Sequence, residues 1–146
     1  MCRMSRRWRL LALFGVLTAP LAVSAVNAQV GDPSATVEAM LVRQDSSDCG
    51  NSDVRADDPS RIGGTVLITR VSGGQYRAKV AITATPNTVY HFFLKCVKQL
   101  GDIKTEDEGE AIAEFEFEAA SAPTFDMYPE GAPAGNKFQS TPVKLP

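Results

Sequence analysis

Alternation of apolar and polar residues is the feature that most constrains how this chain can fold. Between Gln75 and Thr83 an apolar side chain recurs at every second position. The segment from Glu110 to Glu118 shows the same alternation, with apolar Ala113, Phe115 and Phe117 on one face and Glu114, Glu116 and Glu118 on the other. A period of two residues is typical of a half-buried β-strand.

Further segments fit the same interpretation, and turn signals separate them. Ser72-Gly73-Gly74 predicts a tight hairpin between two of them. In the segment that ends at Cys96, the apolar residues Tyr90, Phe92 and Leu94 share a face with Cys96. The expected strands are Ala35–Val42, Thr65–Val71, Gln75–Thr83, Thr88–Cys96, Glu110–Glu118, Thr124–Tyr128 and Lys137–Leu145.

These short strands predict an all-β fold, an antiparallel β-sandwich of about seven strands, with a small β-barrel as the second choice. Three connections are longer than a tight turn: Gln44 to Gly64, Val97 to Gly109, and Pro129 to Asn136. Loops at the end of a rigid scaffold often carry binding sites, so the Tyr128–Gly135 region is the expected place for a specific contact.

Residues 1–28 have the organisation of a cleavable signal peptide. Four arginines precede an apolar run, and small residues follow it. Val26-Asn27-Ala28 favours cleavage between Ala28 and Gln29, with Val23-Ser24-Ala25 as the second choice. The run is about 14 residues and is broken by Pro20, whereas a membrane-spanning helix needs about 20. We therefore expect export to the periplasm or the extracellular space, with no membrane span after cleavage.

The export route has two interpretations. Arginines before an apolar run are typical of general secretion, and the pair Arg6-Arg7 also leaves the twin-arginine route open.

Cleavage after Ala28 leaves 118 residues, 29–146, with 11 basic and 17 acidic residues and a net charge of −6. A chain of this length forms one hydrophobic core and is too short for two domains, so we expect a single β-sandwich domain. Its acidic balance argues against nucleic acid and anionic membranes as partners, because both require a basic face.

The cysteine count predicts a disulfide. Cys2 leaves with the signal peptide, so Cys49 and Cys96 remain. An even number of cysteines in an oxidising compartment favours a bond between them, and two buried free thiols are the alternative. Redox-active pairs are usually close in sequence, so we interpret this bond as structural.

A hairpin-like segment runs from Leu100 to Glu118. Thr105 and the acidic Glu106 open a turn, Gly109 closes it, and a strand with alternating phenylalanines follows. This pattern resembles a hairpin of exported immunoglobulin-like and transthyretin-like β-sandwich modules. The resemblance implies a fold and no particular activity. The chain departs from antibody-type domains, because Trp8 lies in the signal peptide and leaves no tryptophan for the cysteine–tryptophan core.

The sequence predicts no catalytic residue, metal site or cofactor. His91 is the single histidine, with no second histidine for a metal site and no Gly-x-Ser-x-Gly elbow for a hydrolase. We therefore expect a structural or surface role for it.

Two acidic clusters are candidates for binding a cation. The segment Asp45–Asp53 with Asp57-Asp58 gathers five carboxylates, but an EF-hand alignment on Gly50 puts Ala56 where the essential glutamate belongs. Two interpretations of this segment remain open, an irregular calcium site and a solvated loop. Glu106-Asp107-Glu108 is typical of a solvated turn, whereas Glu114, Glu116 and Glu118 are interpreted as protection of an exposed sheet face or edge.

Three functional hypotheses follow. The favoured one is an exported, non-catalytic module that binds a protein or glycan through its loops. The first alternative is a carrier of a small ligand inside a barrel, with Tyr76, Phe92 and Phe115 lining the cavity. The second alternative is a small hydrolase that uses His91, and it requires polar groups clustered around that residue.

Overall fold

The computed structural model describes residues 35–45, 49–51, 54–118 and 122–146. Eight strands and one short 3-10 helix make up this part of the chain, which confirms the all-β prediction. The helix η1 (Pro59–Arg61) is capped by the preceding residue, Asp58, whose side chain accepts a hydrogen bond from the amide of Ser60. The strands are β1 (Thr36–Gln44), β2 (Ile62–Ser72), β3 (Gln75–Thr83), β4 (Val89–Leu94), β5 (Lys98–Lys104), β6 (Glu110–Glu118), β7 (Phe125–Pro129) and β8 (Lys137–Ser140).

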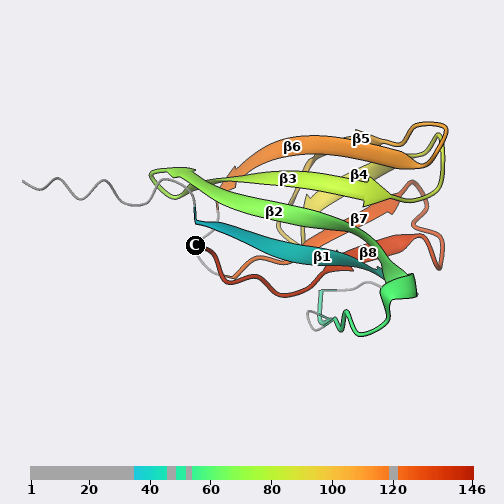
Figure 1. Ribbon diagram of the computed structural model, residues 1–146, viewed down its shortest axis with the longest axis horizontal. Helices are drawn as coiled ribbons and strands as arrows, with labels where there is room; N and C mark the ends of the chain where they lie inside the picture. The colour runs from blue at the N-terminus through green and yellow to red at the C-terminus, as the bar shows by residue number, and fades with distance from the viewer. Residues whose placement is uncertain (1–34, 46–48, 52–53, 119–121) are drawn as a thin grey trace, which may run out of the picture.

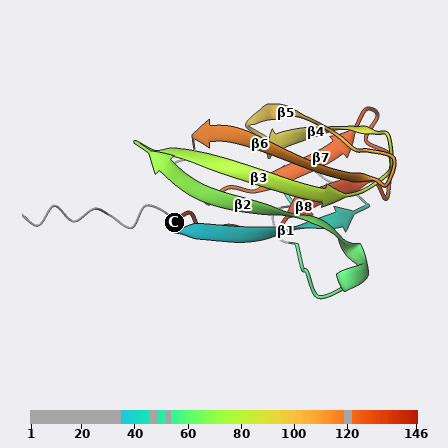
Figure 2. The same ribbon diagram turned by 45° about the horizontal axis from the view of Figure 1, so that its top comes forward.

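All eight strands belong to one antiparallel sheet in the order β5-β4-β7-β8-β1-β2-β3-β6. The sheet curls until its two ends, β5 and β6, lie side by side (Figures 1 and 2). This nearly closed shape corresponds to the small barrel, the second of the two predicted architectures. No helix in the described residues is long and apolar enough to cross a membrane.

The hairpin prediction is confirmed. β2 and β3 pair in antiparallel fashion across Gly73 and Gly74, whose φ angles are 53° and 86°. Both angles lie in the left-handed region, which glycine adopts without the steric penalty that a Cβ would bring.

One strand was not predicted. β5 occupies most of the segment that the sequence pattern assigned to a long connection after Val97. It pairs with β4, and a register shift between Phe92 and Phe93 interrupts the pairing. As an end strand it leaves polar residues such as Lys98 and Asp102 exposed to solvent, which conceals the alternation.

Aromatic rings fill the space inside the curled sheet. Phe92 of β4 stacks on Phe115 of β6 and on Phe125 of β7, with ring centroids 5.2 and 5.3 Å apart. Phe117 meets the ring of Phe125 edge-on and is 1% exposed. Residues expected to face inward on β4 and β6 therefore do so.

Packing brings β5 and β6 together at the seam where the sheet nearly closes. A Cβ built on Gly101 of β5 would lie 2.5 Å from Cε1 of Phe115, which belongs to β6. Any side chain at Gly101 would therefore push the ring or the strand away. Because Gly101 has no side chain, the backbone of β5 can pack directly against the Phe115 ring of β6, which brings the two strands together.

Candidate functional site

The disulfide between Cys49 and Cys96 is present, with the two Cα atoms 5.7 Å apart. Their separation lies within the limit of about 7 Å that a disulfide allows. The expected environment of Cys96 was wrong, however, because this residue is exposed and does not continue the inward face of β4. β4 ends at Leu94, and Cys96 takes a left-handed φ of 58° in the turn that follows. Lys95, which directly precedes this turn, is buried instead.

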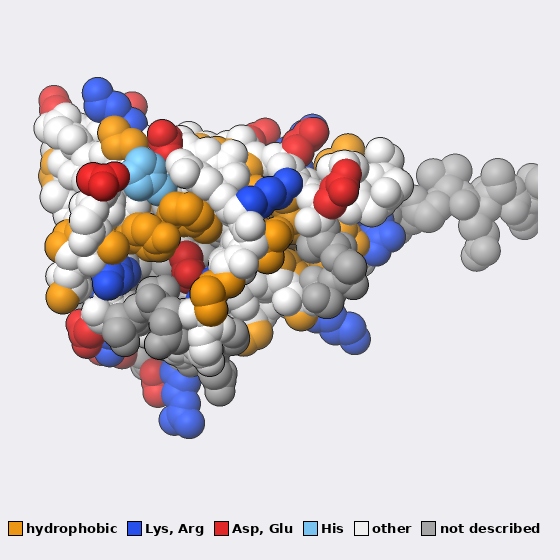
Figure 3. Space-filling view, turned by 180° about the vertical axis from the view of Figure 1, so that it is seen from behind, with side chains coloured by type: hydrophobic (Ala, Val, Ile, Leu, Met, Phe, Trp, Pro, Cys, Tyr) orange, Lys and Arg blue, Asp and Glu red, His pale blue; other side chains and the backbone are white. Residues whose placement is uncertain are grey.

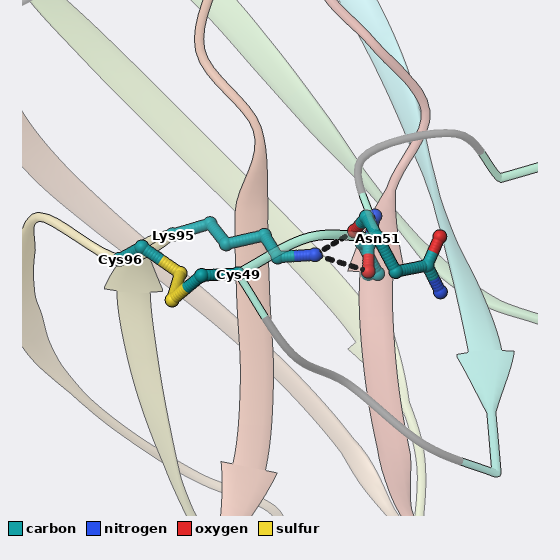
Figure 4. The surroundings of a disulfide bond; sticks show 5 residues. Cys49, Asn51, Lys95 and Cys96 are labelled. Carbon is teal, nitrogen blue, oxygen red and sulfur yellow. Dashed lines mark hydrogen bonds between the residues drawn. A yellow bond between two sulfur atoms is a disulfide. The ribbon is translucent and has the colours of Figure 1, made fainter.

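Lys95 is 8% exposed, and sequence reasoning gave no sign of its burial. Its Nζ atom donates hydrogen bonds to the backbone oxygen of Asn51 and, over 2.8 Å, to Oε1 of Gln139 (Figure 4). The amide of Gln139 also donates to the Asn51 oxygen over 2.8 Å. A buried ammonium group needs such acceptors to offset its lost hydration. The disulfide and Lys95 together anchor residues 49–51 to the outside of the sheet.

A cleft of about 490 Å³ lies on the outer face of the sheet beside this anchor. Phe93 of β4 and Tyr128 of β7 contribute stacked rings, with centroids 4.8 Å apart and planes 18° from parallel. His91 lies next to them, because it is paired with Tyr128 in the sheet and its ring meets that of Phe93 edge-on. We call His91, Phe93 and Tyr128 the aromatic platform. Figure 3 shows this face, with hydrophobic side chains beside the histidine.

The remaining lining residues of the cleft are Cys49, Cys96, Val97, Lys98, Gln99, Asp126, Ala132 and Lys137. The Tyr128–Gly135 region, which was expected to make a specific contact, borders this cleft through Tyr128 of β7 and Ala132 of the turn that follows. Strands β4 and β7 hold the platform, and both are hydrogen-bonded on either side within the sheet. The floor of the cleft is therefore rigid, whereas two turns and the disulfide form its rim.

Charges of both signs meet in the cleft. Asp126 is 6% exposed, and the lysines Lys98 and Lys137 line the same cleft. Burial and, to a smaller extent, the charge of Asp126 raise the pKa of Tyr128 above its ordinary value of 10.0. The phenol consequently remains protonated at neutral pH and can donate a hydrogen bond.

His91 lies between two carboxylates. Its Nδ1 atom is 2.7 Å from Oδ1 of Asp102 on β5, and its Nε2 atom is 3.5 Å from Oε2 of Glu130. Gln99 donates to the same Asp102 oxygen over 2.6 Å. The hydrogen bond to Asp102 is the main cause that raises the pKa of His91 above 6.5, and Glu130 acts in the same direction. The arrangement favours the imidazolium ion.

Polar groups do cluster around His91, which was the condition for the hydrolase alternative. In the described part of the chain, the polar contacts of His91 are two carboxylates and the Gln99 amide, with neither hydroxyl nor thiol among them. A hydrolytic triad requires such a nucleophile within reach of the base.

The acidic segment near Cys49 is described in part. Asp45 lies 3.8 Å from Arg61, and Asp58 caps η1, where the hydrogen bonds from Ser60 lower its pKa. Asp48 and Asp53 lie outside the described residues. Among the residues that are described, no three histidine, cysteine, aspartate or glutamate side chains gather as metal ligands would.

The glutamate row lies on β6, at one end of the strand order. Glu114, Glu116 and Glu118 are exposed, and Glu116 forms an ion pair with Arg77, whose Nη2 atom donates a 3.0 Å hydrogen bond to it. An acidic end strand fits the predicted role of protecting a sheet edge.

The predicted cleavage residues Ala28 and Gln29 lie outside the described part of the chain. No protein-family model matches the sequence, and no curated protein matches it either. The geometry of the cleft therefore carries the functional argument.

Proposed function

We propose that this protein is a non-catalytic binding module that acts outside the cytoplasm and holds its ligand on the aromatic platform. The observation that carries the proposal is the stacked pair Phe93 and Tyr128. Both rings are partly exposed, and both lie on strands that have a neighbour on either side. Large side chains that are fixed before binding lose little conformational entropy when a ligand arrives. Hydrogen-bonding groups at the rim give such a site its specificity.

Export of the protein is part of the same proposal. A structural disulfide is typical of proteins that fold in an oxidising compartment, and Cys49 and Cys96 form one. The expected signal peptide would deliver the chain to the periplasm or the cell exterior. An exposed, acidic binding module fits either location.

The carrier alternative requires space inside the sheet. Tyr76, Phe92 and Phe115 were expected to line such a cavity, and each stacks on a neighbouring ring instead. Tyr76 packs on Phe117 with centroids 5.6 Å apart. These stacks occupy the interior, which favours binding on the outer face.

The test is a nuclear magnetic resonance titration of the exported protein with small probes: neutral sugars, organic anions, amines and short peptides. The proposal predicts that amide shifts gather around Phe93, Gln99 and Tyr128 for at least one probe class. Tyr128→Ala should abolish them, whereas Ile112→Ala, at a 69% exposed position on β6, should leave them unchanged. Shifts confined to the interior rings would support the carrier instead, and shifts confined to another face would overturn the proposed site.

A further inference from the structure

We infer that the ligand of the cleft is a neutral carbohydrate, whose sugar ring lies on the Tyr128–Phe93 stack. This inference rests on the proposed function and names the ligand class for that site. It follows from the charges of the cleft, the position of the cleft in the sheet, and the shape of the aromatic platform.

Charge comes first. An anionic ligand would be attracted by Lys98 and Lys137 but repelled by Asp126, which lies in the same cleft. A cationic ligand would meet the opposite conflict, strengthened by the buried Lys95 next to the disulfide. Like charges at close range cost binding energy and discriminate against a ligand. A neutral ligand meets neither conflict.

The hydrogen-bonding groups of the cleft narrow the chemical class of the ligand further. The ammonium groups of Lys98 and Lys137 donate, and the side-chain oxygen of Gln99, whose nitrogen bonds to Asp102, accepts. A ligand that matches this set must donate and accept at neighbouring positions. Hydroxyl groups have that property, since each contains one donor and two acceptor lone pairs. A neutral molecule with many hydroxyls is the chemistry that fits.

The aromatic platform supplies the apolar contact. The negative face of an aromatic ring attracts positively polarised hydrogens, and the C–H groups on one face of a sugar ring are of this kind. The stack of Phe93 and Tyr128 is fixed on β4 and β7. A cleft of about 490 Å³ also lies within the usual range for small ligands, roughly 300–1,000 Å³.

A peptide strand is a poorer match. An extended peptide gains most of its affinity by pairing with the free edge of a sheet. The platform lies on β4 and β7, which pair with neighbours on both sides, whereas the sheet ends at β5 and β6. A peptide in the cleft would therefore bind through side chains alone.

The experiment combines a saccharide array with calorimetry on the exported protein. Cellotriose, chitotriose and maltotriose are the neutral probes, tri-galacturonate is the anionic probe, and an extended acidic or basic hexapeptide is the control. At least one neutral oligosaccharide should bind, and raising the NaCl concentration from 50 to 500 mM should change its Kd less than twofold, because salt screens only interactions between charges. Tyr128→Ala should weaken binding about tenfold, the loss expected when a stacked ring is removed, and Gln99→Ala should weaken it less.

Two controls keep the variants interpretable. Tyr128→Phe retains the ring and should keep most of the affinity, while Ile112→Ala lies on β6 and should bind as the wild type does. Circular dichroism confirms that each variant is folded.

The outcomes separate the two proposals. If tri-galacturonate or a peptide binds the cleft and no neutral saccharide does, the carbohydrate inference is wrong while the cleft remains the site. If neutral saccharides bind but Tyr128→Ala has no effect, the site itself is wrong. If no neutral saccharide on the array binds, the inference is overturned.

Discussion

Removal of the disulfide tests how the segment around Cys49 is held. Cys49 and Cys96 are 47 residues apart, so the chain-entropy model assigns the bond about 4 kcal/mol at 25 °C. Both residues are exposed, and replacing them opens no cavity in the core. Lys95 and Gln139 still hold the backbone of Asn51, so the native state keeps a second anchor. We expect Cys49→Ser/Cys96→Ser to lower the free energy of unfolding by about 2–4 kcal/mol.

The assay is urea unfolding of the exported protein and of the double variant, followed by circular dichroism of the strands. The native spectrum should not change. The denaturant slope should increase, because the unfolded chain is less compact without the cross-link. Wild-type protein treated with a reductant should behave as the double variant does. The reasoning fails if the loss is below about 1 kcal/mol, if the strand signal disappears, or if two free thiols are titrated in the native protein.

Three further predictions concern the seam, His91 and processing. Gly101→Ala should lower the free energy of unfolding by about 1–3 kcal/mol in urea, since its Cβ would overlap the Phe115 ring; a neutral effect would show that the seam is loosely packed. Because the pKa of His91 is raised by Asp102, its stabilisation is present below pH 6.5 and is lost as the pH rises through the folded-state pKa. His91→Gln should therefore destabilise more at pH 5.5 than at pH 8.5 in thermal melts, and an equal effect at both would contradict the ion pair. Intact mass of exported protein should show Gln29 as the first residue, and retention of residue 1 would contradict the signal peptide.

Strands could be predicted from the sequence where one of their faces lies in the core and the other in solvent. The bounds of Gln75–Thr83 and Glu110–Glu118 were predicted correctly, because these neighbouring strands each turn one face to the core and one to solvent. β5 was missed because it lies at an end of the sheet and because Leu100, which has no partner in β4, interrupts its alternation. The local sequence pattern cannot show that a polar segment forms a strand by pairing with the edge of a sheet.

In the candidate site, too, features that depend on contacts between residues distant in sequence could not be predicted. The disulfide followed from a count of cysteines. The pairing of His91 with Asp102 depends on the register between β4 and β5, so it could not be predicted without that strand. The burial of Lys95 depends on acceptors from Asn51 and from β8, which are distant in sequence. The expected contact at the Tyr128–Gly135 region stays a prediction, which rests on the tendency of scaffold loops to form sites.

The pairing of β1 with β8 determines when the fold can be completed. Leu41–Gln44 pairs with residues 137–140, and this short ladder connects the group β5-β4-β7-β8 to the group β1-β2-β3-β6. The β2–β3 hairpin needs only neighbouring residues and can form while the chain is still being made. The two groups, however, cannot be joined until the last strand has emerged. If the chain crosses a membrane unfolded, its sheet is completed only after nearly all of it has reached the other side, in the compartment where Cys49 and Cys96 can be oxidised.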